Sequence, residues 1–238
     1  MNILAVETSS PVLSVALQRR DGMTKEIIFE TGLHHVEKLM LFVRELLSEL
    51  QIKKEKIDLI VCGVGPGSFT GLRVGLSAVK GLALGLGKKI VAVSSLDLIA
   101  EGAGLSEEKL AVVLDARRER LYTALYQFKA GTPRKILKDS LLSLDQLIKL
   151  VDSNTVFTGS ALVTYGDQIE KKLGRDVRWL DEKFWHPKAS SIFSLLKHNQ
   201  AAVKTIPLRQ LKPMYLRLSE AEEKRKTIKR QTHARAAC

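Results

Sequence analysis

The stretch GVGPGSFTGLRVG, residues 63–75, determines how the rest of this chain is interpreted. Five of its thirteen residues are glycine and one is proline, and it separates an apolar run at 59–62 from a second one that starts at Leu72. Glycine and proline at this density indicate a loop between a strand and a helix. Loops of this kind often hold a phosphate group, so the first question is whether this one does.

Two phosphate-binding motifs can be compared with the stretch. A P-loop requires GxxxxGK followed by serine or threonine, whereas Gly71 is followed here by Leu72 and Arg73, with no lysine and no hydroxyl group to hold magnesium. A dinucleotide fingerprint requires GxGxxG, and Pro66 interrupts the glycines at that point. The stretch is therefore not a P-loop, and its match to the dinucleotide fingerprint is weak.

The segment after the loop is more informative, because residues 70–86 read as a helix that is apolar nearly all round. Only Arg73, Ser77 and Lys80 interrupt its apolar surface after Leu72, and glycines recur at 71, 75, 81 and 85. Such a helix needs cover on both sides, and its glycines permit close approach of another backbone. One side is expected to pack on its own sheet. The other would pack on a helix at 34–50 or on a second protein chain, although a helix buried within one large fold remains an alternative.

Further out, strands and helices alternate in both halves of the chain. The first half predicts strands at 2–7, 13–18, 25–30, 58–63 and 90–93, with helices at 34–50, 70–86 and 96–101. The second half predicts strands at 109–115, 121–128, 135–139 and 155–158, with helices at 144–150, 161–173 and 190–198. Each half begins with an antiparallel meander, which suggests an internal duplication. We therefore expect an α/β fold with lobes at 1–102 and 103–218 and a poorly ordered basic tail at 219–238.

The composition limits the class of protein. The chain has 238 residues, a formal net charge of +12 and two cysteines, Cys62 and Cys238, which is too few for a disulfide framework. No membrane span is expected, and a reducing cytoplasm is the expected location. A basic surplus of this size favours a nucleic-acid neighbour, although ordinary solvated surface charge explains it about as well. Part of the charge lies in the tail, which has six Lys or Arg residues against three Glu.

Several segments together resemble a known family. They are NILAVETSSPVLSVAL at the start, the loop and helix GVGPGSFTGLRVGLSAVKGLALGL, VVLDARRERLYTALY in the second half, and PMYLR near the end. In this order they are similar to the TsaB family. Its members are non-catalytic subunits of the bacterial machinery that makes threonylcarbamoyladenosine beside the anticodon of tRNAs reading codons that begin with A. The resemblance covers residues 1 to about 218.

The resemblance implies the two-lobed actin-like fold of sugar kinases, heat-shock proteins and actin, with duplicated lobes. In that superfamily an acid followed by a glycine-containing turn grips phosphate in each lobe. The first matching turn here contains Glu7, Thr8 and Ser9, and the second begins at Asp115. The first acid is one methylene longer than aspartate, and neither turn contains glycine. Both phosphate turns are therefore expected to be degraded.

No intrinsic metal site or hydrolase site is predicted. The catalytic paralogue in this machinery, TsaD, holds its metal with two histidines four residues apart and a distant aspartate. The histidines here are at 34, 35, 186, 198 and 233, and no two are four apart. The serine motif GxSxG is also missing, because no glycine lies two residues after Ser68.

The resemblance implies that this chain binds a TsaD-like partner through the helices at 34–50 and 70–86. The candidate interface residues are His35, Leu39, Arg73, Gly75, Leu76, Val79, Leu82 and Ala83. A histidine at a helix start is more often an ordinary surface feature than a partner contact. Large residues at Gly75 or Ala83 are expected to weaken association more than stability. Without its partner, the same surface is expected to form a homodimer.

The complex would transfer a threonylcarbamoyl group to adenosine, with the chemistry on the partner's metal. No intrinsic cofactor is expected, but ATP or ADP is implied at the interface with the partner, together with a TsaE-like small ATPase. Arg117, Arg118 and Arg120 are candidate RNA contacts, or else part of a solvated hairpin. Two rival functions are a standalone ATP-dependent enzyme of the actin-like fold and a protease acting on its paralogue.

Overall fold

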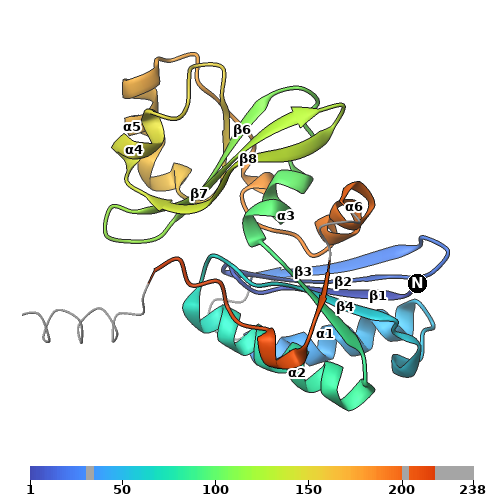
Figure 1. Cartoon of the computed structure of the whole chain (residues 1–238). Coiled ribbons are helices and arrows are strands. Elements are labelled where there is room, and N and C mark those ends of the chain that lie inside the picture. Colours follow the sequence, from blue (N-terminus) through green and yellow to red (C-terminus); the bar gives the residue numbers. More distant parts are fainter. Residues whose placement is uncertain (31–34, 200–203, 218–238) are drawn as a thin grey trace, which may run out of the picture.

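The computed structural model describes residues 1–30, 35–199 and 204–217, which form two lobes (Figure 1). The first lobe contains the strands β1 (Ile3–Glu7), β2 (Val12–Gln18), β3 (Thr24–Glu30), β4 (Leu59–Gly63) and β5 (Lys89–Val93). Its helices are α1 (His35–Glu49) and α2 (Phe69–Leu86), with the short η1 (Lys54–Lys56) between them in sequence. Each of these strands and longer helices lies within two residues of its expected range.

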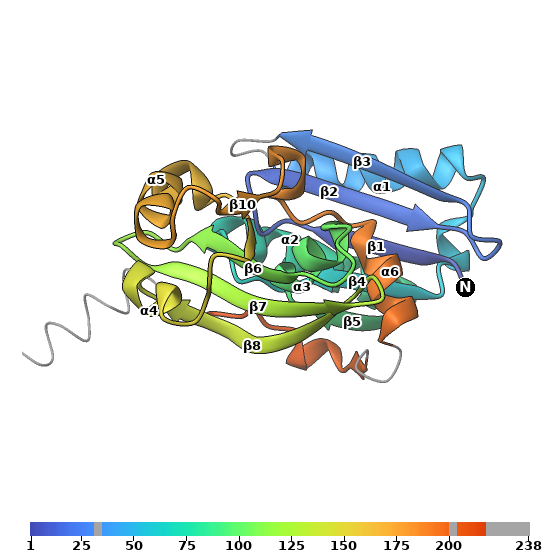
Figure 2. The same cartoon turned by 90° about the horizontal axis from the view of Figure 1, so that it is seen from above.

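The second lobe contains the strands β6 (Lys109–Asp115), β7 (Leu121–Lys129), β8 (Thr132–Leu142), β9 (Val156–Thr158) and β10 (Arg178–Trp179). Its helices are α4 (Leu144–Ile148) and α5 (Leu162–Leu173), and η2 (Glu182–Phe184) follows β10. Strand β8 is longer than the expected 135–139, and the two-residue β10 was not predicted. In the view from above, α4 and α5 lie at the end of the molecule opposite the N-terminus (Figure 2).

The two sheets have the same topology. The strand order is β3-β2-β1-β4-β5 in the first lobe and β8-β7-β6-β9-β10 in the second. In each lobe the first three strands pair antiparallel and the next two add in parallel. Antiparallel strands can be joined by tight turns, whereas the parallel pairs need helical crossovers, so the duplicated pattern in the sequence became a duplicated sheet. The expected α/β fold of two lobes with duplicated sheets is confirmed.

Helices and sheets form alternating layers. Helices α1 and α2 cover the lower face of the first sheet, while α4 and α5 pack on the outer face of the second. Two further helices, α3 (Ser95–Gly102) and α6 (Ser191–His198), lie between the sheets (Figure 1). Helix α3 sends Leu98 toward the first sheet and Leu96 and Ile99 toward the second. The connection between the lobes is therefore itself a buried part of the core.

The chain returns to the first lobe near its end. Strand β11 (Thr205–Ile206) pairs with β5, η3 (Leu208–Gln210) follows, and Leu211 is buried in the core beneath the first sheet. The backbone N–H of Met214 donates to the carbonyl of Val64 at 2.7 Å. The expected range of 103–218 for the second lobe therefore extends too far, because residues 205–217 lie with the first. The predicted tail at 219–238 lies outside the described residues.

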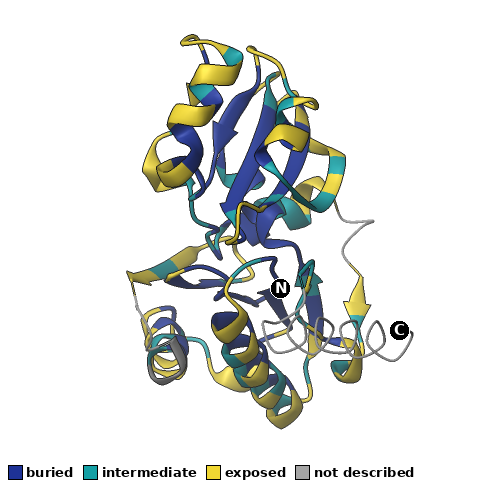
Figure 3. Cartoon of the chain, turned by 90° about the vertical axis from the view of Figure 1, so that its left-hand side faces the viewer, coloured by how far each residue is buried: buried dark blue, intermediate teal, exposed yellow. Residues whose placement is uncertain are grey.

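Among the described residues, α2 alone has the length and hydropathy of a membrane-spanning helix. About a third of it is buried against its own lobe, where Leu76, Val79 and Ala83 pack beneath the first sheet. A core helix that packs on a sheet on one side and carries small apolar residues on the other can have the same length and hydropathy. The burial pattern in Figure 3 shows this division along α1 and α2.

Candidate functional site: the glycine-rich loop and the outer faces of α1 and α2

The glycine-rich loop holds another part of its own chain. Gly63, Gly67, Gly71 and Gly75 are spaced four apart, and all four abut the turn between β1 and β2. A β-carbon at Gly63 would overlap the Glu7 carboxylate, and one at Gly67 would overlap the carbonyl of Ser9. At Gly71 and Gly75 it would overlap the carbonyl and the hydroxyl of Thr8. Glycine is required here because the first turn occupies the space that a side chain would need.

Glu7 lies at the centre of this contact and is fully buried. Its carboxylate accepts hydrogen bonds from the backbone N–H of Ser9 at 2.5 Å and from the hydroxyl of Ser95 at 2.8 Å. Burial raises the pKa of Glu7, and these donors partly oppose the rise. Ser95 is the first residue of α3, and its hydroxyl also accepts from the N–H of Gly65 at 3.2 Å. Glu7 thus links the first turn, the loop and the interlobe helix.

The second phosphate-type turn, residues 115–120, is also closed by its own chain. The Asp115 carboxylate accepts from the backbone N–H of Arg117 at 2.7 Å, and the Ala116 N–H donates to the Arg120 carbonyl at 2.9 Å. Arg117, Arg118 and Glu119 have φ values of 63°, 51° and 58°, the left-handed region that favours glycine. Glu7 and Asp115 therefore both accept hydrogen bonds from residues of the turns that follow them.

Among the described residues, no group of three or more His, Cys, Asp or Glu side chains is placed to hold a metal ion. His198 pairs instead with Glu101 of α3, with 3.0 Å between Nδ1 and Oε2. Cys62 is buried, and burial raises the pKa of its thiol. His198 thus makes a hydrogen bond within the fold, and Cys62 packs in its core.

Five of the predicted interface residues face the core of their own lobe. They are Leu39 on α1 and Gly75, Leu76, Val79 and Ala83 on α2, all of them buried. The periodic pattern identified the apolar stripe correctly, but that stripe packs beneath the first sheet. The expectation that large residues at Gly75 or Ala83 mainly weaken association is therefore wrong, since both positions are filled by the fold. Leu82 is half-buried, Arg73 is exposed, and the side chain of His35 lies outside the described part of the chain.

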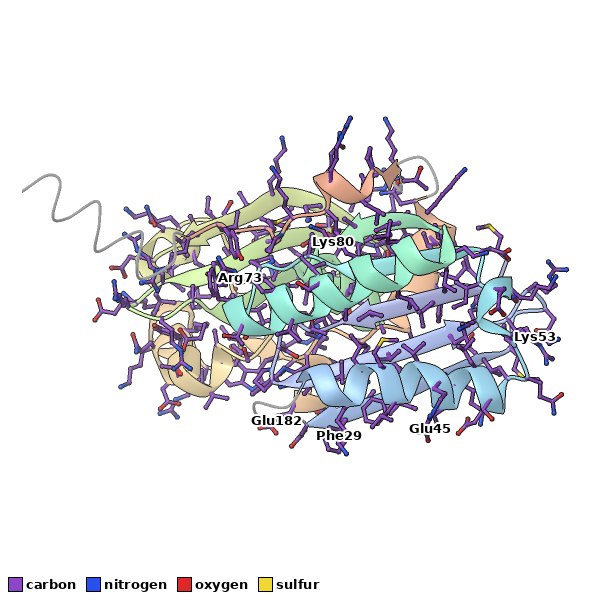
Figure 4. All side chains as sticks on the ribbon, turned by 90° about the horizontal axis from the view of Figure 1, so that it is seen from below. Phe29, Glu45, Lys53, Arg73, Lys80 and Glu182 are labelled. Carbon is purple, nitrogen blue, oxygen red and sulfur yellow. The ribbon has the colours of Figure 1, made fainter. Side chains whose placement is uncertain are left out.

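The outer faces of α1 and α2 lie side by side on one surface of the molecule (Figure 4). On α1, Met40 is 45% exposed and Leu41 is 46% exposed. On α2, Leu84 is 73% exposed and lies beside Gly81 and Gly85, where a β-carbon would meet open space. A hollow of about 640 Å³ runs along the exposed side of α1 and is lined in part by Leu41 and Phe42. Sequence periodicity missed Leu41 and Leu84 because both lie off the main stripe.

An aromatic and cationic cluster lies at the start of α2. The rings of Phe69 and Tyr215 stack with their centroids 5.1 Å apart, and the Arg73 guanidinium lies 3.8 Å from the Phe69 ring centroid. Arg73 Nε donates to the Tyr215 hydroxyl at 2.9 Å. The segment 204–217 thereby crosses the beginning of α2. Two residues after Tyr215, Arg217 donates to the Ala116 carbonyl at 2.6 Å. The three predicted RNA contacts, Arg117, Arg118 and Arg120, lie in the same turn as Ala116, between β6 and β7.

The structure defines a two-lobed α/β protein with duplicated sheets, and comparisons with known proteins identify its family. A family model described as "TsaD: tRNA N6-adenosine threonylcarbamoyltransferase" matches residues 29–224. A Bacillus subtilis protein named tRNA threonylcarbamoyladenosine biosynthesis protein TsaB is 34% identical over 227 residues, which are 94% of this chain and 97% of that protein. The Haemophilus influenzae protein of the same name is 28% identical over 231 residues, covering 91% and 94% of the two chains.

A solved structure agrees with these relatives. YeaZ from Pseudomonas aeruginosa has a TM-score of 0.75 and 28% sequence identity, covering 90% of this chain and 99% of its own. The chain therefore belongs to the TsaB family of tRNA threonylcarbamoyladenosine biosynthesis proteins, as the motifs in its sequence indicated.

Proposed function

We propose that this chain is a non-catalytic subunit that docks a TsaD-like catalytic paralogue and thereby enables threonylcarbamoyl transfer to tRNA. The observation that carries the proposal is the pair of outer helix faces. Helices α1 and α2 lie side by side in Figure 4, and each carries exposed large apolar side chains, Met40 and Leu41 on α1 and Leu84 on α2. Large apolar side chains exposed on neighbouring helices favour an interaction site.

The closed turns support a structural role for the glycine-rich loop. Atoms of Glu7, Thr8 and Ser9 fill the space beside its glycines, so a phosphate at that place would have to displace the first turn. The transfer chemistry is accordingly assigned to the metal of the partner. ATP or ADP would bind at the interface with that partner, and a TsaE-like small ATPase would act on the assembled complex.

The docking surface suits helix-on-helix packing. Gly81 and Gly85 leave depressions on either side of Leu84, a relief that accepts side chains from a second pair of helices. The hollow beside Leu41 and Phe42 lies on the other side of α1, toward β3, where Phe42 packs on Phe29. In the absence of the paralogue, the same surface would pair with that of a second copy to give a twofold homodimer.

The direct test of the proposal is product formation. Purified paralogue and small ATPase from the same organism are incubated with unmodified tRNA transcript, threonine, bicarbonate, ATP and the enzyme that makes the threonylcarbamoyl adenylate. We expect threonylcarbamoyladenosine only when this chain is added, and none from this chain alone. Equal product formation with and without the chain would refute a subunit role.

Two controls separate the rival functions. The chain alone is assayed for ATP hydrolysis, which a standalone ATP-dependent enzyme would show, and for cleavage of the paralogue and of casein, which a protease would show. We expect neither activity. Steady turnover in either assay would replace the docking proposal with that rival.

A further inference from the structure

The surface around Tyr215 combines stacked rings with arginines drawn from three separate segments. Phe69 and Arg73 come from α2, Tyr215 and Arg217 from the terminal segment, and Arg117 from the turn between β6 and β7. Phe69 is 36% exposed and Tyr215 is 44% exposed. Hydrogen bonds from Arg73 to Tyr215 and from Arg217 to Ala116 fix the three segments to one another.

From this arrangement we propose that the surface formed by Phe69, Arg73, Arg117, Tyr215 and Arg217 binds a single-stranded segment of RNA. The inference rests on the proposed function, since it names this chain as a direct contact for the tRNA. Unpaired bases stack on aromatic rings, and arginines attract the adjacent phosphates. A base that stacks on Tyr215 would extend a stack that Phe69 and Arg73 already hold in order, so little ordering cost remains.

The neighbouring turn between β6 and β7 presents Arg117 to solvent. Arg117, Arg118 and Glu119 in this turn have the left-handed backbone conformation that favours glycine. The Arg117 side chain is 86% exposed and lies 4.0 Å from Asp115, so much of its guanidinium is accessible to phosphate.

Charge complementarity favours RNA over a protein partner for this surface. The chain carries a formal net charge of +12. The described part of the chain ends at Arg217, and the residues that follow add six Lys or Arg against three Glu. A polyanion is therefore attracted both by the surface and by the sequence that continues from it.

The test measures the affinity of the full-length chain for a fluorescently labelled short single-stranded RNA and for an unmodified tRNA transcript. Tyr215→Leu should weaken binding of the single strand by at least about fivefold, since it removes a stacking ring. Tyr215→Phe keeps the ring and should bind within about twofold of the parent chain. Arg73→Gln combined with Arg117→Gln should reduce the slope of log affinity against log salt by roughly 1.4.

Control variants assign the effect to this surface. Lys53→Ala combined with Lys54→Ala removes the same charge from exposed positions at the other end of the molecule, where Figure 4 labels Lys53. We expect this pair to retain its affinity for the single strand. Equal losses from both double variants would mean nonspecific charge attraction and would overturn the proposal.

Binding to the TsaD-like paralogue is measured for the same variants. If Tyr215→Leu weakens that association and leaves RNA binding unchanged, the surface contacts protein and the RNA proposal is wrong. Unchanged RNA binding in a chain that is still required for threonylcarbamoyladenosine formation refutes this inference alone. A chain that is not required for product refutes the proposed function instead.

Discussion

At the scale of single residues, Glu7 is a fully buried acid whose carboxylate is used within the fold. Its carboxylate accepts from Ser9 and Ser95, and the missing side chain of Gly63 leaves room for it. This buried acid thus joins the first turn to the helix between the lobes.

This burial predicts a particular pH dependence of stability. Because the pKa of folded Glu7 is raised above its ordinary value of 4.5, the folded chain holds this proton more firmly than the unfolded chain. The stability contributed at low pH is then lost as the pH rises through the folded pKa. Glu7→Gln removes this titration, so its stability relative to the parent should improve from acidic to neutral pH. Urea unfolding of both proteins across this range tests the prediction, and a constant or opposite difference would contradict it.

At the scale of elements, α2 carries two classes of glycine that the sequence alone does not separate. Gly75 faces the Thr8 side chain, whereas Gly81 faces open space. Both lie inside one helix, and each has another glycine four residues away, Gly71 for Gly75 and Gly85 for Gly81. The difference arises from what folds against each face.

Alanine substitutions distinguish the two classes. Gly75→Ala should destabilise the fold by about 1–3 kcal/mol, because the new methyl group collides with Thr8. Gly81→Ala should stabilise it by about 0.5–1 kcal/mol, because alanine is the better helix former and meets no neighbour. Chemical unfolding of both variants checks the order. Equal effects at the two sites would mean that the first turn does not press on α2.

The order and type of most elements could be predicted because strong local signals specify them, as in the continuous apolar run of the strand at 109–115. The orientation of α2 could not be predicted, since a helix apolar nearly all round has no polar face to indicate its outer side. The stacking of Phe69 on Tyr215 could not be predicted either, because the two residues lie far apart in sequence and meet only when the chain returns to the first lobe. No local sequence pattern indicates that the segment PMYLR lies beside the glycine-rich loop.

At the scale of the whole molecule, hydrogen bonds fix the segment before α6 to the first sheet. Glu26 of β3 accepts from the Ser14 hydroxyl at 2.7 Å and from the N–H and hydroxyl of Ser190, next to α6, at 3.0 and 2.6 Å. The Ala189 N–H donates to Ser14 at 2.7 Å. With α3 buried between both sheets, the lobes form a platform that holds the outer faces of α1 and α2 in one arrangement.

The central claim is that these outer faces dock the catalytic paralogue, and the most direct measurement is the affinity between the two purified proteins by calorimetry. Leu84→Glu places a charge at the centre of the proposed interface and should weaken binding at least tenfold. Val163→Glu changes an apolar residue of α5 that is 77% exposed and remote from that face, and it should leave binding unchanged. Parent-like binding by the Leu84 variant, or equal losses from both substitutions, would contradict the account.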